Sequence, residues 1–404
     1  MIALEAAQAI VQEAFAARVA AIERVDVEAA LGRVLAEDLA APFDLPGFAN
    51  SAMDGYAVRY ADLARDNETR LQVAGTLLAG HVGPARIEPG QCARITTGAA
   101  LPEGADTVVI KEHARVEGDT VVLVAGTAER ANVRGPCDDF ASGSPVVPHG
   151  RRLGPAELAA ARAFGLETLT VRAMPRVAIV VGGDELVRAG MPRGPGQRYE
   201  SNGALLRALV AENGARASSV ELVADEPDAI AAALARAARA ADLVLTTGGV
   251  SAGEADFLPG LVERLGRIGF WKVRMRPGMP VLFGEVYGTP VFSLPGNPVS
   301  VFATFIALVE PALAMLMRAP PRREVVCARL ATPVDKRHDR LELRRATLRC
   351  DEHGVLHVDL HASLSSGALR SLVESDALAE LAAEARRFEV GEVVRVHRFR
   401  GAAA

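Results

Sequence analysis

The spacing of apolar residues changes along the chain and divides it into segments of different type. Apolar side chains recur at helical spacing over residues 4–22, which predicts an amphipathic helix, and a second helical run covers 155–164. Between these helices, short apolar runs are broken by Gly and Pro, as in a small β-rich domain. The strands expected there cover residues 71–73, 93–96, 107–110 and 120–124.

After Pro175, apolar runs alternate with helical segments. Strands are expected at residues 177–181, 218–222, 243–245 and 270–275. Helices are expected at residues 202–213, at 227–240 and from Asp256 onward. This alternation predicts right-handed βαβ units that form a parallel sheet with helices on both faces.

The last part of the chain follows a linker at residues 320–321 and has β-like spacing again. Its apolar runs cover residues 325–330, 341–348, 355–360 and 393–396. The whole pattern predicts an α/β multidomain protein. An inserted β-rich domain is expected over residues 43–143, an α/β domain over 173–320 and a C-terminal β domain over 321–404.

Composition and charge limit the function classes. A chain of 404 residues, 50% of them apolar, is long enough for several packed domains. The net charge of -5 gives no general reason to bind nucleic acid or an anionic membrane, so neither partner is expected. The N-terminus lacks a basic leader, and no apolar run approaches the roughly 18 residues of a membrane span. Four cysteines without a C-x-x-C pair favour reduced thiols in a cytoplasmic protein.

A glycine-rich turn at residues 246–256 joins an apolar strand to a helix. Its small residues are Gly248, Gly249, Ser251 and Gly253. They allow backbone N–H groups to close around an oxyanion, and the helix end adds partial positive charge, so the turn is predicted to hold a phosphate-like group. Asp256 in the first helical turn is either a charge at the cap or a metal ligand, and the spacing does not choose.

Three acidic residues, Glu185, Asp225 and Asp256, follow successive strands of the predicted sheet. Because the carboxyl ends of parallel strands meet at one edge, these acids are expected at the same rim. Each alone is most often a solvated loop acid, but their equivalent places point to a shared site. An acidic rim beside an anionic ligand requires a cation, and hard oxygen ligands suit Mg²⁺.

Three further polar residues lie in turns whose local pattern leaves their role open. Asp54 precedes a glycine, and an isolated Asp at such a place is most often a turn former. Thr97 also precedes a glycine, which suits either a turn or an oxyanion contact. In the strand-to-helix turn Pro295, Gly296, Asn297, the asparagine either caps the helix or contacts a ligand.

These motifs occur in one order from about residue 4 to about residue 398. The segments concerned are 51–57, 97–106, 183–186, 201–202, 246–256 and 294–300. In this arrangement the chain resembles the MoeA family, the molybdopterin molybdenumtransferases, to which the E domain of gephyrin also belongs. The resemblance implies that the protein takes molybdopterin-AMP (adenylylated molybdopterin) and molybdate, cleaves the adenylate with the help of Mg²⁺, and releases molybdenum cofactor and AMP.

The resemblance also implies roles for individual residues. Asp54 becomes an active-site acid and Thr97 a functional hydroxyl, and the rim acids become catalytic. Asp139 is implied as a further acid, although Cys137 and Asp138 replace the Gly and Glu that precede it in the family. Contacts with substrate are implied for Arg276, Arg340, Arg345 and Ser366.

Two departures from the family pattern bear on anion binding. Met279 stands where the family has a second lysine, which predicts a weaker attraction for an anion. Leu364 and Ser365 replace the Gln and Gly that precede the serine matched by Ser366.

The domain assembly and the partners are likewise implied by the resemblance. Residues 1–42 and 144–172 are expected to form one discontinuous N-terminal domain. An elongated homodimer is expected to join the Gly249 rim of one subunit to the Asp54 domain of the other. Molybdopterin adenylyltransferase and recipient molybdoenzymes are candidate protein partners.

Two alternative functions fit part of the sequence. Molybdopterin adenylyltransferase shares the glycine turn at 248–251 but is a single small domain, so the additional domains argue against it. A non-catalytic scaffold or paralogue would keep the fold and could lose the acids. Because the five acids at positions 54, 139, 185, 225 and 256 are all present, the sequence favours the enzyme.

Overall fold

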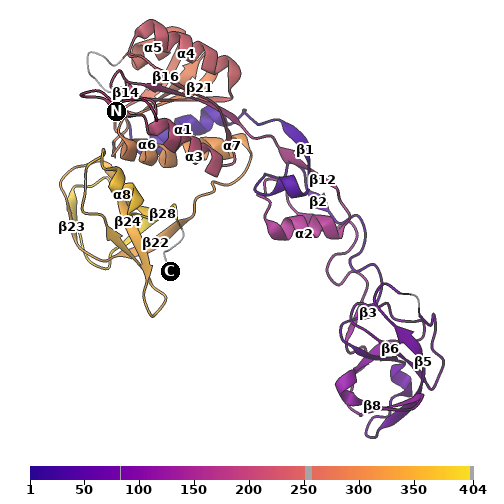
Figure 1. Cartoon of the computed structure of the whole chain (residues 1–404). Helices are drawn as coiled ribbons and strands as arrows, with labels where there is room; N and C mark the ends of the chain where they lie inside the picture. The colour runs from indigo at the N-terminus through magenta and orange to yellow at the C-terminus, as the bar shows by residue number, and fades with distance from the viewer. Residues whose placement is uncertain (82, 251–256, 401–404) are drawn as a thin grey trace.

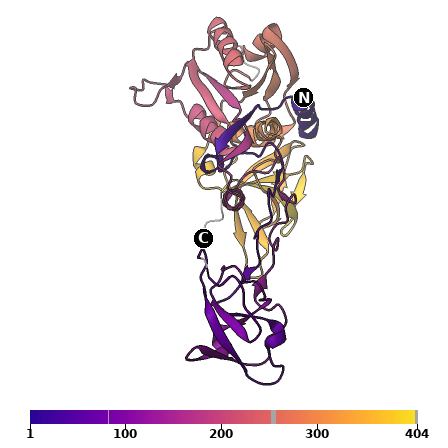
Figure 2. The same ribbon diagram turned by 90° about the vertical axis from the view of Figure 1, so that its right-hand side faces the viewer.

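The computed structural model describes residues 1–81, 83–250 and 257–400. The molecule is elongated, with an α/β domain and a C-terminal β domain together at one end, a small middle domain, and a β domain at the far end (Figure 1). The α/β domain and the distal β domain remain at opposite ends when the molecule is turned (Figure 2). The expected multidomain α/β architecture is therefore present.

The α/β domain is built on a six-stranded sheet. In spatial order its strands are β16 (Arg216–Val223), β13 (Arg176–Gly182), β17 (Leu243–Thr247), β21 (Thr289–Leu294), β20 (Leu282–Val286) and β18 (Gly266–Trp271). The first four are parallel, as predicted, whereas β20 and β18 are antiparallel to their neighbours. The sheet is therefore mixed, and its parallel half carries the predicted rim.

Helices cover both faces of this sheet, as the alternation predicted. One face packs against α1 (Leu4–Phe15), α3 (Asn202–Glu212) and the helical stretch α6 (Pro298–Thr304), η4 (Phe305–Val309) and α7 (Glu310–Leu316). The other face packs against α4 (Pro227–Ala240) and α5 (Leu258–Leu265). A short arm, β14 (Leu186–Val187) paired with β15 (Arg198–Tyr199), follows β13.

The position of α1 differs from the prediction. Its buried residues belong to the core of the α/β domain, where the Phe15 ring lies 6.2 Å from Phe283 and 6.5 Å from Phe292. The helix also ends at Phe15 instead of continuing to residue 22, and Ile22 begins a strand of the middle domain. An amphipathic pattern shows that a helix has an apolar face but not which core receives that face.

The helical stretch Pro298–Leu316 corrects the expectation that no apolar run is as long as a membrane span. With 19 residues and a mean hydropathy of 2.0, it is long and apolar enough to cross a membrane. However, 89% of this stretch is buried inside the protein, where it packs with α1 and α3. It is the central core helix of the α/β domain, and its apolar composition reflects that burial.

The middle domain is made from two separate parts of the chain. Strand β1 (Ile22–Asp26) pairs with β12 (Thr168–Arg172), and β2 (Leu39–Ala40) pairs with β11 (Pro145–Val147). The helix α2 (Pro155–Ala163) and the turn η1 (Glu28–Ala30) complete a small core. Residues 22–40 therefore pair with the later segment, whereas α1 does not join them; the exact domain limits stay a prediction.

The distal domain contains the strands expected between residues 71 and 124. Its sheet has the order β7 (Thr107–Ile110), β4 (Gly55–Val58), β6 (Gln91–Ile95), β5 (Thr69–Leu77), β9 (Thr120–Leu123) and β8 (Ala114–Glu117). A separate pair, β3 (Asn50–Ser51) with β10 (Val133–Arg134), lies next to the connections with the middle domain (Figure 1). Short 3₁₀ turns, η2 (Tyr60–Asp62) and η3 (Lys111–His113), follow β4 and β7.

The C-terminal domain is a small barrel. Its strands follow the order β19 (Met275–Arg276), β24 (Leu341–Cys350), β25 (Leu356–Leu360), β22 (Val325–Leu330), β28 (Val393–Arg398) and β26 (Ala377–Leu381), and a further β24–β26 pairing closes it. A short pair, β23 (Val334–Lys336) with β27 (Arg386–Phe388), and the helix α8 (Leu369–Val373) complete the domain.

The strand predicted at residues 270–275 is wrong as a single element. Its first part belongs to β18 in the α/β sheet, whereas β19 pairs with Leu341 and Glu342 in the barrel. The break lies at Lys272, whose φ of 68° turns the backbone out of the extended region. The segment around Arg276 therefore connects the two domains.

Candidate functional site

The carboxyl rim of the α/β sheet is built from strand ends that approach one another very closely. Gly248 follows β17 with a φ of +94°, and a Cβ added there would lie 2.7 Å from the carbonyl oxygen of Gly182. A Cβ on Gly296, after β21, would lie 3.8 Å from the Cα of Gly248. Only glycine combines this conformation with this spacing at position 248. Gly249, with a φ of +60°, continues the turn.

A buried polar network lies beneath these glycines. The amide of Asn202, at the start of α3, donates to Thr247 Oγ1 at 3.0 Å and to the carbonyl of Gly296 at 2.7 Å. Thr247 Oγ1 in turn donates to the carbonyl of Pro295 at 3.0 Å. Asn202 and Thr247 are only 8% and 2% exposed, so the network ties α3, β17 and the turn after β21 together. Sequence reasoning gave neither residue a role, because only tertiary contact brings them together.

Two of the three predicted rim acids lie over the turn after β13. Asp225 Oδ1 is 3.1 Å from the position of a Cβ added to Gly182, and Glu185 Oε2 is 2.9 Å from that of a Cβ added to Gly183. The backbone N–H of Asp225 also donates to Asp184 Oδ1 at 3.0 Å, which adds an acid that sequence reasoning missed. The feature of the sequence that could have identified Asp184 is its position just after β13, the strand that Glu185 also follows.

The remaining predicted residues of this turn, Ser251, Gly253 and Asp256, lie outside the described residues. Within the described part of the chain, no group of three His, Cys, Asp or Glu side chains is arranged to hold a metal ion. The carboxylates of Glu185 and Asp225 nevertheless supply hard oxygen donors at one turn. Mg²⁺ commonly takes one or two carboxylates together with phosphate oxygens and water, so this donor set fits that ion.

A basic group lies where the α/β domain meets the barrel. Arg276 lies in β19, and the Nη1 atom of Arg340 is 3.9 Å from the Sδ atom of Met279. Arg274 is paired with Asp339, its Nη2 lying 2.6 Å from Oδ2, so its charge is neutralised. Arg340 therefore occupies the neighbourhood in which the family pattern places a second lysine.

His338 lies beside this basic group. Burial lowers the pKa of His338 below its usual range, and the charges of Arg276 and Arg340 lower it further, while Glu342 opposes them. The Nε2 atom of His338 lies 3.3 Å from the Oε2 atom of Glu342. The neutral imidazole thus adds no net positive charge to the two arginines at neutral pH.

Asn297 and Ser366 come from different domains and meet in the structure. The amide of Asn297 donates to Ser366 Oγ at 3.0 Å, and the backbone N–H of Val299 donates to the carbonyl of Ser366 at 3.1 Å. Asn297 occupies the position before α6, but its side chain makes no capping hydrogen bond with that helix. Of the two roles left open by the sequence, side-chain capping is therefore excluded.

Arg345 is buried, in contrast to Arg340. It is 2% exposed, and its donors contact Ser371 Oγ at 3.0 Å, the carbonyl of Ser365 at 3.3 Å and the carbonyl of Ser363. Burial, followed by the charge of Arg344, lowers the pKa of its guanidinium. The resemblance implied a substrate contact, but the structure surrounds this side chain with groups of its own domain.

Asp54 and Thr97 form a second cluster, in the distal domain. Asp54 Oδ1 accepts hydrogen bonds from the backbone N–H and the hydroxyl of Thr97, both at 2.9 Å, and Oδ2 lies 3.4 Å from Lys111 Nζ. The Thr97 backbone, its hydroxyl and the Lys111 ammonium hold the pKa of Asp54 below its usual range. The two residues, which the sequence analysis named separately, are therefore in contact, and Lys111 is a partner for which the sequence had no local signal.

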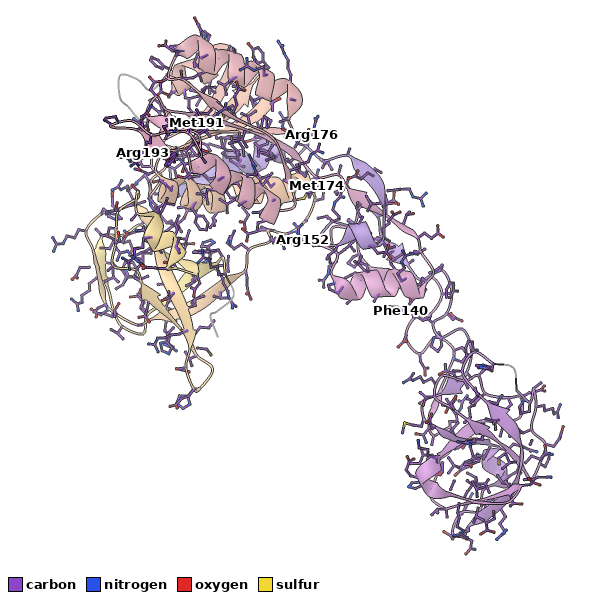
Figure 3. All side chains as sticks on the ribbon, viewed as in Figure 1. Phe140, Arg152, Met174, Arg176, Met191 and Arg193 are labelled. Carbon is purple, nitrogen blue, oxygen red and sulfur yellow. The ribbon has the colours of Figure 1, made fainter. Side chains whose placement is uncertain are left out.

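Asp139 is not brought into this cluster. Asp139 is exposed and lies in the connection to the middle domain. Its backbone N–H donates to the carbonyl of Leu45 at 3.0 Å. The neighbouring ring of Phe140, labelled in Figure 3, packs against Phe164 of the middle domain with 5.7 Å between centroids. Among the described residues, no hydrogen bond joins Asp139 to Asp54.

Comparison with known sequences identifies the family. The profile "MoeA N-terminal region (domain I and II)" matches residues 2–165, "Probable molybdopterin binding domain" matches 178–315, and "MoeA C-terminal region (domain IV)" matches 327–399. A Haemophilus influenzae protein named molybdopterin molybdenumtransferase is 32% identical over 383 residues, covering 93% of this chain and 94% of that protein. The chain belongs to the MoeA family.

Other MoeA relatives agree over the full length. A Mycobacterium tuberculosis protein named molybdopterin molybdenumtransferase 2 is 36% identical over 386 residues, covering 92% of this chain and 94% of that protein. A crystal structure of a MoeA protein from Pyrococcus horikoshii has a TM-score of 0.84 at 30% identity, covering 99% of this chain and all of that one. The similarity extends over all domains, so a single-domain adenylyltransferase does not account for this chain.

The candidate residues fall in all three MoeA regions. Asp54 and Thr97 lie in the N-terminal region, the rim lies in the molybdopterin-binding region, and Arg340 and Ser366 lie in the C-terminal region. The contact between Asn297 and Ser366 joins the second region to the third. The Asp54 cluster, by contrast, lies in the distal domain, far from the rim of the same chain (Figure 1).

Proposed function

We propose that this MoeA-family protein inserts molybdate into molybdopterin-AMP and releases AMP. Water cleaves the phosphoanhydride bond, giving AMP and a molybdopterin phosphate. The two dithiol sulfurs then bind molybdenum, while their protons and one molybdate oxygen leave as water. The observation that carries the proposal is the rim, where closely spaced glycines and the carboxylates of Glu185 and Asp225 adjoin the turn at 248–249.

The rim is suited to the phosphate end of the substrate. Glycine at position 248 allows the tight turn without a side chain, and its own N–H donates to the carbonyl of Leu294 at 3.3 Å. Further backbone N–H groups of such a turn would stabilise developing negative charge. Glu185 and Asp225 would hold Mg²⁺, with Asp256 as a further ligand that stays a prediction from sequence. When bound, Mg²⁺ neutralises phosphate charge and polarises a phosphoryl oxygen.

The basic group at the barrel is suited to molybdate. Arg276 and Arg340 supply the positive charge, to which His338 adds none, since its lowered pKa leaves it neutral at neutral pH. Asn297 and Ser366 supply uncharged hydrogen-bonding groups next to the rim. A tetrahedral dianion would thus meet cations on one side and the dithiolene of a bound pterin on the other.

Asp54 would act as an ionised carboxylate. Its pKa is lowered by the hydrogen bonds from Thr97 and the charge of Lys111, so at neutral pH it accepts hydrogen bonds and orients water, and it is a poor proton donor. Thr97 and Lys111 hold it in place, and Asp139 would assist from the adjoining connection.

The proposed active unit is a homodimer in the cytoplasm, with molybdopterin adenylyltransferase as supplier and molybdoenzymes as recipients. The separation of the Asp54 domain from the rim along one chain supports this assembly (Figure 1). A second copy could bring its distal domain to the rim of the first. The active site would then contain residues from both copies.

Incubation with molybdopterin-AMP, Mg²⁺ and molybdate tests the reaction. AMP release and formation of active cofactor are both expected, and the Asp225→Asn protein serves as the control because it removes a rim charge while preserving size. Failure of the wild-type protein to release AMP under these conditions would contradict the proposal.

Mixing two inactive variants tests the shared site. Asp54→Asn and Asp225→Asn proteins, mixed in equal amounts and allowed to exchange subunits, should regain about a quarter of wild-type turnover, because about half of the dimers become heterodimers and each heterodimer keeps one intact site of two. Heterodimers that are demonstrably formed but inactive would exclude a site composed of both chains.

A further inference from the structure

The charged side chain of Arg345 is enclosed within the C-terminal barrel. It is 2% exposed, although it carries a guanidinium, and no carboxylate is hydrogen-bonded to it within the described ranges. Its contacts are instead a hydroxyl, Ser371 Oγ, and the carbonyl oxygens of Ser363 and Ser365. Burial of a charge is costly unless its donors are satisfied, so these contacts constrain where the serine loop lies.

The same loop, residues 363–367, contacts the α/β domain. Ser366 Oγ accepts from the Asn297 amide at 3.0 Å, and the Ser366 carbonyl accepts from the Val299 backbone at 3.1 Å. The start of α8 is held as well, because Ser371 Oγ donates to the carbonyl of Ala368 at 2.6 Å. One side of the loop is thus fixed by Arg345 and the other side lies against the turn that follows β21.

We propose that Arg345 is a positioning residue, which clamps the 363–367 loop so that Ser366 lies beside Asn297 at the oxyanion-binding face. Arg345 itself does not contact the oxyanion. The identity of the oxyanion as molybdate rests on the proposed function, but the clamp is a property of the chain alone. The barrel thereby contributes a preformed wall to a site whose remaining parts lie in the α/β domain.

Arg340 provides the contrast that assigns this role. Among the described residues, the guanidinium of Arg340 has one polar contact, with the thioether Sδ of Met279 at 3.9 Å, and a thioether is a weak acceptor. Its strong donors therefore remain available to an anion, whereas those of Arg345 are used within the barrel. Arg340 and Arg345 are only five positions apart in the sequence, but they have different roles: Arg340 is available to bind an anion, and Arg345 holds the loop.

The geometry of the clamp requires an arginine. A guanidinium presents donors in a rigid planar fork, whereas a lysine ammonium is a point charge on a flexible stem. Arg345 uses Nε toward Ser371 and Nη2 toward two carbonyls, so one lysine nitrogen cannot reach all three acceptors in the same way. Arg345→Lys keeps the charge and removes the clamp.

Hydrogen exchange of the loop, measured without substrate, tests the clamp directly. In Arg345→Lys, exchange at residues 363–367 should accelerate by about tenfold or more relative to the wild type, because the loop loses its fixed contacts. Arg340→Lys is the matched control, and its loop should exchange as in the wild type. Ser371→Ala removes one acceptor and leaves the buried charge, so it should give a smaller acceleration and covers the case in which Arg345→Lys folds poorly.

Molybdate titration of cofactor formation tests the consequence for the site. Arg345→Lys should raise the half-saturating molybdate concentration by about tenfold while turnover at saturation stays close to that of the wild type, because fewer molecules hold the loop in place. Unchanged loop exchange together with weakened molybdate binding would mean a direct ligand contact and would overturn the proposal. A wild-type protein that shows no molybdate dependence would instead contradict the proposed function, since the exchange measurement needs no substrate.

Discussion

At the rim of the α/β sheet, the acids lie over strand ends so close that a methyl group at position 248 would meet the Gly182 carbonyl at 2.7 Å. In the distal domain, the Asp54 side chain is 46% exposed and is held by Thr97 and by the Lys111 side chain, which is itself 60% exposed. The rim rests on a buried network, Asn202 with Thr247, whereas the Asp54 cluster rests on contacts at the surface.

The comparison shows two ways of placing a carboxylate. At the rim, packing and buried hydrogen bonds set the geometry, so changes should alter stability and activity together. At Asp54, surface hydrogen bonds lower the pKa of the carboxylate, and surface contacts contribute little to stability. Changes there should alter activity alone. Three substitutions test this difference, and a fourth, at the basic group beside the barrel, gives the smallest effect.

The largest effect is expected for Gly248→Ala. The new Cβ would lie 2.7 Å from the Gly182 carbonyl and hold a non-glycine residue at a φ of +94°, so we expect a loss of about 4 kcal/mol and little turnover. Gly288→Ala, in the β20–β21 turn, is the control, because its φ is +81° but nothing lies within 4 Å, so only about 1 kcal/mol should be lost. Urea unfolding measures both, and equal losses would mean that the rim is not closely packed.

Asp54→Asn should lower turnover by about 100-fold without changing the thermal midpoint. The substitution keeps size but removes the charge that Thr97 and Lys111 stabilise. Asp119→Asn, an exposed acid of the same domain, is the control and should leave turnover unchanged. A large fall in the thermal midpoint of Asp54→Asn would show that the cluster supports the fold after all.

Thr97→Val should shift the acid limb of the pH–rate profile upward. Hydrogen bonds from Thr97 and the charge of Lys111 lower the Asp54 pKa, so the ionised form is fully populated near neutral pH and is lost as the pH falls through that lowered pKa. Removing the hydroxyl raises the pKa, so turnover should fall by about threefold at an acidic pH on that limb, whereas near neutral pH, where Asp54 stays ionised, it should change little. Thr97→Ser keeps the donor and should retain the wild-type profile; an identical shift in both variants would exclude the hydroxyl as the cause.

The smallest effect is expected for Met279→Lys. The sequence alone predicts that the added cation tightens molybdate dependence modestly, by about tenfold. However, Arg340 Nη1 lies 3.9 Å from Met279 Sδ and already supplies a charge there. Because like charges repel, we expect half-saturation to change by no more than about threefold. The double variant Met279→Lys, Arg340→Met moves the charge without adding one and should behave like the wild type. A tenfold tightening in Met279→Lys would show that Arg340 does not serve the anion.

The sequence determined those features that depend on local spacing. Helix α4 covers residues 227–240 as predicted, since an apolar stripe and a proline at its first position define it. Strand β22 covers 325–330, also as predicted. The rim acids Glu185 and Asp225 could be placed together because the carboxyl ends of parallel strands meet at one edge.

Tertiary structure alone decided which separate segments meet. The apolar run at 270–275 reads as one strand, but a turn at Lys272 sends its end into another sheet. The apolar face of α1 fits the core of the middle domain or that of the α/β domain by its spacing alone. In the structure it packs in the larger core, that of the α/β domain. Both outcomes depend on which core the segment packs against in the folded chain. The spacing of apolar residues describes only the segment itself.

The same limit separates Lys111 and Arg345 from the residues that the sequence found. Lys111 and Asp54 are 57 positions apart in the chain, and the local sequence around either residue does not predict their contact. Arg345 follows another arginine and reads as part of a charged strand, yet it is 2% exposed. Whether a charged side chain meets solvent, ligand or its own domain depends on what the folded chain places around it, because burial and hydrogen-bond partners come from distant segments.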